Sequence, residues 1–363
     1  MPASPFSATY AEARAKFLEA ATAAGAQLSA WVHPERGPDG GELATDVAWI
    51  GPTDAAAVLM LVSATHGVEG HCGSGAQIDW LQRDEAARIG PRQAVLLVHA
   101  INPYGFAWSR RVTHENVDLN RNFVDFNQPL PENLGYDALA SAVSPREWTD
   151  VSLSASRAAF RAHVSTHGYD ALVQALSGGQ YRHPDGVYYG GASETWSRRT
   201  LTGIFAKHLA RARHVGVLDY HTGLGPTGYG EPMVSADNRS AEYARALAWY
   251  GAAVTSVSAG DSASAKLTGD WLDAMPALVP HTELTGMALE FGTVPGAQVM
   301  DAVRADNWLH HHGDPRSAKG LAIAAATRAA FYTDTDLWRG MVLGQSLIAT
   351  RQALAGLARA VGT

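Results

Sequence analysis

The chain has 363 residues, of which 46% are hydrophobic and 17% are charged, and its formal net charge is -7 at pH 7. This length suits one large α/β domain or two average domains, and the hydrophobic fraction supplies a sizeable core. The low charge content and negative balance leave no large basic surface, which argues against nucleic-acid binding.

Cysteine usage and the N-terminal segment predict the compartment. The one cysteine, Cys72, cannot form an intramolecular disulfide, so we expect a small buried residue in a reducing environment. The segment "MPASPFSATYAEARAKFLEAATAAGA" lacks the basic and apolar regions of a signal peptide, and no apolar run is long enough to span a membrane. These features predict a soluble, cytoplasmic protein that does not act at a membrane.

Residues 1–50 predict a helix followed by a hairpin. Residues 8–24 place apolar side chains at helical spacing. The Gly-, Pro- and charge-rich stretch "HPERGPDGGE" is typical of a turn between short strands.

Four apolar segments further along the chain predict buried parallel strands. They are residues 56–64, 94–101, 214–220 and 287–291. Between the first two lies a helical pattern that we expect to end at Gly90 and Pro91, which makes a strand–helix–strand unit. The repetition predicts an α/β fold with an open, mixed but mostly parallel twisted sheet and helices on both faces. In such sheets the functional groups lie at the carboxyl ends of the strands.

Two later regions complete the predicted organisation. Residues 125–200 are rich in Gly, Pro and aromatic residues, so we expect an excursion of loops and helix off the sheet. Its "LSGGQ" at 176–180 matches the signature of ABC-type ATPases, but no G-x-x-x-x-G-K-[ST] accompanies it, so we interpret its glycines as loop residues. From "TDTDLW" onward the pattern predicts one long helix or a broken pair, with Asp334 or Thr335 as N-cap. No shift in composition divides the chain, which predicts a single domain over 1–363.

Potential metal ligands follow two of the predicted strands. "HGVEG" supplies His66 and Glu69, and "DYHTG" supplies His221. Two imidazoles and a carboxylate are a common ligand set for catalytic zinc, with the fourth position open. An isolated H-x-x-E is a weak signal, but Gly67 permits the tight turn that would aim both side chains at one ion, and the placement at strand ends strengthens the prediction.

Four motifs together resemble those of the zinc carboxypeptidase superfamily, which includes the aspartoacylase and succinylglutamate desuccinylase branch. They are "HGVEG", "INPYGFAWSRRVTHENVDLNRNF", "DYHTG" and "ALEFGT", in this order between residues 66 and 292. The resemblance implies that His66, Glu69 and His221 bind one zinc ion per chain. It also implies that Glu290 is the general base and acid, a role that a carboxylate near a metal-activated water can fill.

The same resemblance implies roles for the residues of "RRVTHENVDLNR". Asn120 and Arg121 would hold the terminal carboxylate of the substrate, for which the planar guanidinium is well suited. Arg111 would face the scissile carbonyl oxygen, and Arg110 is its rival because the two arginines are adjacent. Asp219, two residues before His221, would either orient that histidine or bond nearby backbone amides.

Some expectations stay open at this stage. Digestive members of the superfamily use a loop tyrosine above the substrate, and here Tyr229 and the tyrosines of "DGVYYGG" are candidates. The predicted activity is that of a metallohydrolase that cleaves an amide beside a free carboxylate. A metallocarboxypeptidase acting on peptides comes first, a deacylase of N-acyl amino acids second, and a zinc-retaining binding protein without catalysis third. The expected partner is therefore a small-molecule or peptide substrate with a free carboxylate.

Overall fold

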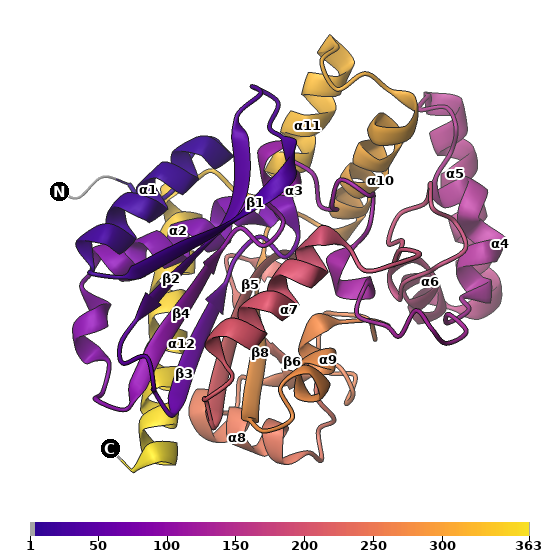
Figure 1. The fold of residues 1–363 in the computed structure, drawn as a ribbon. Coiled ribbons are helices and arrows are strands. Elements are labelled where there is room, and N and C mark those ends of the chain that lie inside the picture. The colour runs from indigo at the N-terminus through magenta and orange to yellow at the C-terminus, as the bar shows by residue number, and fades with distance from the viewer. Residues whose placement is uncertain (1–3, 363) are drawn as a thin grey trace.

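The computed structural model describes residues 4–362, which build an eight-stranded mixed sheet with helices on both faces (Figure 1). The strand order is β1-β2-β4-β3-β5-β8-β6-β7. The strands are β1 Gln27–Arg36, β2 Glu42–Ile50, β3 Ala57–Val62, β4 Gln93–His99, β5 His214–Thr227, β6 Gly230–Val234, β7 Thr255–Ser256 and β8 Glu283–Gly292. The central ladders β4-β3-β5-β8 are parallel, whereas β1, β2 and β6 pair antiparallel with their neighbours, except that β6 and β7 are parallel. The predicted fold class is confirmed.

The helices fall into three groups around this sheet (Figure 1). Helices α2, α8 and α12 pack on one face, α7 and α9 pack on the other, and α4, α5 and α6 stand off the sheet beside α10. Their bounds are α1 Tyr10–Ala23, α2 Gly70–Gln82, α3 Pro103–Ala107, α4 Leu134–Val143, α5 Asp150–His167, α6 Tyr169–Ser177, α7 Trp196–His208, α8 Ala241–Tyr250, α9 Trp271–Leu278, α10 Gly296–His312, α11 Ala318–Phe331 and α12 Asp336–Val361, with short 3-10 helices η1 Gly67–Glu69, η2 Glu85–Arg88 and η3 Leu119–Arg121.

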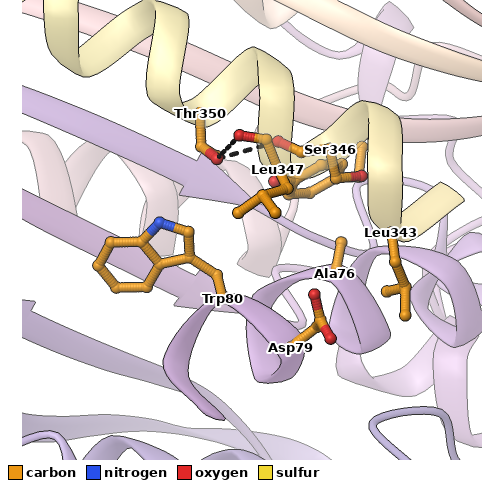
Figure 2. Close-up of a pocket in the computed structure, with 8 residues that line it drawn as sticks. Ala76, Asp79, Trp80, Leu343, Ser346, Leu347 and Thr350 are labelled. Carbon is orange, nitrogen blue, oxygen red and sulfur yellow. Dashed lines mark hydrogen bonds between the residues drawn. The ribbon is translucent and has the colours of Figure 1, made fainter. Parts of the chain in front are cut away.

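Side-chain alternation along β5 separates the core from the functional groups. Figure 2 shows α12 lying over α2, where Leu343 and Leu347 face Ala76 and Trp80. Tyr220 of β5 lines the same interface. Because successive side chains of a strand point to opposite faces, its neighbours Asp219 and His221 point away from this interface, and both lie on the side that holds the candidate site.

The structure corrects several predicted boundaries. Strands β5 and β8 are longer than predicted, and β5 extends past His221, which is therefore a direct register partner of Glu290 in β8. The predicted 33–42 turn shrinks to the residues between β1 and β2, because the hairpin pairs as far as Arg36 and Glu42. The predicted helix ending at Gly90 is split into α2 and η2, because Asp84 adopts a left-handed backbone with φ 57°.

The C-terminal region is a single helix, so the broken pair is wrong. Thr335 is its N-cap, since its side chain accepts a hydrogen bond from the Trp338 backbone N–H. Over residues 4–362 no helix is both long and apolar enough to cross a membrane.

Candidate metal centre

The candidate site lies at the carboxyl ends of β3, β5 and β8. In the turn that joins β3 to α2, His66 is the N-cap of η1 and Glu69 is its last residue, and His221 lies in β5. The possible ligand atoms of these three residues all lie within 4.8 Å of one another. The structure therefore brings together the three predicted metal ligands, although His66 and His221 are 155 positions apart in the chain.

Two glycines let the ligand turn approach the segment after β4. A Cβ at Gly67 would lie 2.1 Å from the carbonyl carbon of Gly105, a distance that no side chain permits. The backbone N–H groups of Gly67 and Val68 donate to the carbonyl oxygens of Arg111 and Arg110, at 3.0 and 2.8 Å. The turn that carries His66 and Glu69 is thus fastened to the segment that carries both arginines.

The ligand geometry leaves one nitrogen of each imidazole facing the shared centre. His66 Nδ1 lies 3.0 Å from Glu69 Oε1, and His221 Nδ1 lies 2.9 Å from Glu69 Oε2 and 3.2 Å from His66 Nδ1. His221 Nε2 faces a carboxylate, with Asp219 Oδ2 at 2.7 Å, whereas His66 Nε2 lies 3.3 Å from Asp118 Oδ1 and 2.9 Å from Arg111 Nη2. Metal-binding histidines are commonly oriented by such carboxylates. Of the two alternatives for Asp219, the structure shows contact with His221.

The charges around this centre match a divalent cation. Four buried carboxylates, those of Glu69, Asp118, Asp219 and Glu290, surround two buried guanidinium groups. If all four carboxylates are ionised and both imidazoles are neutral, as metal binding requires of its ligands, two negative charges remain for a divalent cation to neutralise. Donor atoms, orientation and charge therefore all fit zinc.

The pKa directions follow from the same charges. Burial, together with the negative charge of Glu69, raises the pKa of Glu290 to about 8. Burial alone would also raise the pKa of Glu69, but His66 and His221 lower it below its ordinary value. A bound cation would favour the ionised form of both carboxyl groups.

The adjacent arginines point to different places. Arg111 donates from Nη1 to Glu69 Oε1 at 2.9 Å and from Nε to Asp118 Oδ2 at 3.2 Å, so it lies against the ligand cluster. Arg110 instead pairs with Asp306 of α10, with Nε 3.1 Å from Oδ1, and donates to Asn116 Oδ1 at 3.1 Å. The structure therefore places Arg111, not its rival, beside the metal ligands.

The predicted carboxylate clamp lies on η3, next to Asp118. Arg121 donates from Nη1 to Asp118 Oδ1 at 3.2 Å and from Nη2 to the Ser177 carbonyl at 2.6 Å. Within residues 4–362, Arg121 Nε and Asn120 Oδ1 are buried without a hydrogen-bond partner. Buried polar atoms of native proteins are nearly always paired, so these two indicate space for a polar ligand.

Two residues of the excursion at 125–200, Ser177 and Gly179, were missed from the sequence, whereas Tyr188 is one of the candidate tyrosines of "DGVYYGG". Ser177 and Gly179 of "LSGGQ" pack on Arg121, and Gly179, with φ 105°, lies where a Cβ would be 2.8 Å from Arg121 Cγ. The ring of Tyr188 lies under both guanidinium groups, with its centroid 5.6 Å from Arg111 Cζ and 5.0 Å from Arg121 Cζ. Tyr188 also has a positive φ of 54°, which is uncommon outside glycine and recurs at functional sites.

Asp118 is the third missed residue. It bridges Arg111, Arg121 and His66, and its side chain also caps η3 through the Asn120 N–H. Its place in "DLNR", two residues before Asn120, is the signal that could have found it. The candidate Tyr229, in contrast, is 40% exposed in the turn between β5 and β6.

The fold and site define an α/β protein with a His–Glu–His cluster at the strand ends that could hold a metal ion. The chain belongs to the family described as "Protein of unknown function (DUF2817)", which it matches over residues 6–345. No curated protein matches it.

Several solved structures are similar. Carboxypeptidase A from Helicoverpa armigera is 15% identical with a TM-score of 0.47, and the match covers 89% of this chain and 73% of that one. Succinylglutamate desuccinylase from Chromobacterium violaceum is 14% identical with a TM-score of 0.38, over 87% and 73%. Murein-tripeptide amidase MpaA from Escherichia coli O157 is 14% identical with a TM-score of 0.35, over 85% and 93%. Similarity at this level defines neither the reaction nor the substrate of this chain.

Proposed function

We propose that the protein is a zinc-dependent hydrolase that cleaves an amide bond beside a free carboxylate. The observation that carries the proposal is the convergence of His66 Nδ1, Glu69 and His221 Nδ1 within 4.8 Å, with Glu290 as the direct strand partner of His221. These three residues would hold the zinc. When bound, the ion supplies Lewis-acid chemistry and brings the pKa of a water molecule to about 7.

Glu290 is the proposed general base and acid. Its Oε1 accepts a hydrogen bond from the Leu224 N–H at 3.0 Å, which fixes the carboxylate beside His221 and leaves Oε2 for proton transfer. The carboxylate would take the proton of the attacking water and later deliver it to the leaving nitrogen. Arg111, held by Glu69 and Asp118, would donate to the carbonyl oxygen as negative charge develops there.

Asn120 and Arg121 are the proposed clamp for the free carboxylate of the substrate. Asp118 and the Ser177 carbonyl fix the guanidinium, and its Nε is a buried donor without a partner among residues 4–362. A carboxylate held there would receive charge-assisted hydrogen bonds, which are the strong ones in a buried site. This clamp would direct cleavage to the amide bond next to a terminal carboxylate.

A metallocarboxypeptidase acting on peptides is the first form of this proposal. A deacylase of N-acyl amino acids is the second form of the proposal, and the burial of the site residues favours it. His66, Glu69, His221, Arg121 and Glu290 are all buried. The excursion also reaches Arg121 through Ser177 and Tyr188, so a short acyl group would fit under this cover more readily than a long peptide.

Metal analysis combined with a substrate screen tests the proposal. We expect about one zinc per chain, and cleavage either of peptides with a free C-terminus or of N-acyl amino acids. Glu290→Gln should retain zinc and lose activity, whereas His66→Ala should lose the metal. A protein that holds no transition metal after metal-replete expression, or a fully active Glu290→Gln variant, would contradict the proposal.

A further inference from the structure

A third carboxyl group continues the row formed by His221 and Glu290. β6 pairs antiparallel with β8, and Glu231 is the direct partner of Glu290, as His221 is on the other side. Directly paired residues of neighbouring strands project to the same face of a sheet. His221, Glu290 and Glu231 therefore lie side by side on the face that carries the candidate metal centre.

Glu231 is a buried carboxyl group whose hydrogen bonds involve only one of its two oxygen atoms. It is 5% exposed, and its Oε1 accepts hydrogen bonds from Thr255 Oγ1 at 2.7 Å and the Ala263 N–H at 3.1 Å. Across the described part of the chain, no Lys, Arg or His forms an ion pair with it, and Oε2 accepts no hydrogen bond. Oε2 forms no hydrogen bond with the described residues and is not a fully enclosed atom, so it is open to pair with a cationic group.

The segment 257–269 connects Glu231 to the carboxylate clamp. Ala263 donates to Glu231, and at the other end of the segment the Gly269 carbonyl accepts from the Phe123 N–H at 3.0 Å. A Cβ at Gly269 would lie 2.4 Å from the carbonyl oxygen of Arg121, so this end of the segment packs directly on the clamp. The half of the substrate that carries the carboxylate thus lies beside the same segment that contacts Glu231.

We infer that Glu231 selects substrates in which the amino acid bearing the free carboxylate has a basic side chain. Its carboxylate would pair with the ammonium or guanidinium group of that side chain while Arg121 holds the α-carboxylate. This inference rests on the proposed function and adds the substrate class to it. Glu231 and Arg121 are then opposite in charge, and they match the basic side chain and the α-carboxylate of that amino acid.

The alternative role of Glu231 is to anchor the 257–269 segment. Glu231→Gln separates the two roles, because the amide oxygen can still accept from Thr255 and Ala263 while the negative charge is removed. Glu242→Gln is the matched control. Glu242 of α8 accepts one backbone hydrogen bond, from the Gly286 N–H at 2.8 Å, and is not one of the proposed metal-binding, catalytic or clamp residues.

Binding of the expected product to the zinc-loaded protein tests the inference without requiring turnover. Calorimetry would compare L-lysine with L-norleucine, which has the same unbranched side chain without the ammonium group. We expect wild type and Glu242→Gln to bind lysine about 10- to 100-fold more tightly, the range for one hydrogen bond between charged groups. In Glu231→Gln the preference should fall to near unity, with an unchanged melting temperature and unchanged norleucine affinity.

Equal binding of lysine and norleucine by wild type would overturn the inference even if Glu231→Gln failed to fold. A lysine preference that survives in a folded Glu231→Gln variant would also overturn it. In both cases cleavage of neutral substrates would leave the proposed function standing. The proposed function itself fails if wild type, loaded with zinc, cleaves neither basic nor neutral amides that carry a free carboxylate.

Discussion

Asp219 controls which nitrogen of His221 is available to a metal. We therefore predict that two substitutions of Asp219 lower the zinc affinity by different amounts. Asp219 Oδ2 accepts from His221 Nε2 at 2.7 Å and from Trp271 Nε1 at 2.8 Å, and Oδ1 accepts from Thr65 Oγ1 at 2.8 Å. The carboxylate therefore keeps the proton on Nε2 and leaves Nδ1 as the ligand atom.

The two substitutions at this position should differ in size. In Asp219→Asn the amide oxygen can occupy the Oδ2 position and still accept from His221 and Trp271, while its NH2 group donates to the hydroxyl of Thr65. Only the charge is lost, so we expect zinc affinity to fall about tenfold. Asp219→Ala removes every acceptor, so zinc affinity should fall about 100-fold, or about 2.7 kcal/mol. The unpaired Trp271 N–H adds about 1–3 kcal/mol of destabilisation.

Competition with a chromophoric chelator measures the zinc affinities, and thermal unfolding of the metal-free protein measures stability separately. Asp46→Ala is the matched control, because Asp46 is an equally buried carboxylate that pairs with Arg14, with Oδ2 2.7 Å from Nε, and touches no predicted ligand. It should lower stability and leave zinc affinity unchanged. Wild-type zinc affinity in a folded Asp219→Ala variant would show that the carboxylate does not orient the ligand.

Two further predictions concern the clamp and the pH dependence of stability. Arg121→Ala should lower kcat/KM by roughly 30-fold or more, the range for truncating one partner of a buried charge pair. Amidation of the substrate carboxylate should slow wild type by a similar factor and slow the variant much less; equal sensitivity would contradict the clamp. Burial lowers the pKa of His99 to about 3, whereas an unfolded histidine titrates near ~6.5. Between these values the unfolded state binds the proton and the native state does not, so stability falls as the pH drops below ~6.5. At pH 5 the loss from this residue is about 2 kcal/mol relative to pH 7.5. Urea unfolding of wild type and His99→Gln at both pH values should show a smaller difference in the variant.

The sequence was most informative where a local pattern determines the outcome. The apolar runs of β3 and β4 predicted buried strands because parallel strands covered on both faces carry continuous apolar side chains. The short strand β6 was not predicted, because it contains Pro232 and a polar residue, Glu231, that a central strand seldom carries. The candidate ligands His66 and Glu69 could be predicted because a short motif holds them after a strand.

The remaining parts of the site depend on contacts between distant segments. Ser177 and Tyr188 reach the arginines only because the excursion folds back over η3, and no local spacing marks that return. The choice between Arg110 and Arg111 depended on Asp306, almost 200 positions away, which pairs with the first arginine and leaves the second for the site. Glu231 became visible only through the register of β6 against β8.

The separation of His66 and His221 by 155 positions also bears on how the protein folds. A metal that bridges them needs β3 and β5 already paired, and such long-range pairing is slow because a long loop must close first. Zinc therefore contributes little to the early steps of folding. Interactions that form after the transition state slow unfolding and leave the folding rate almost unchanged. In this chain a bound metal would mainly slow unfolding and so lengthen the lifetime of the native state.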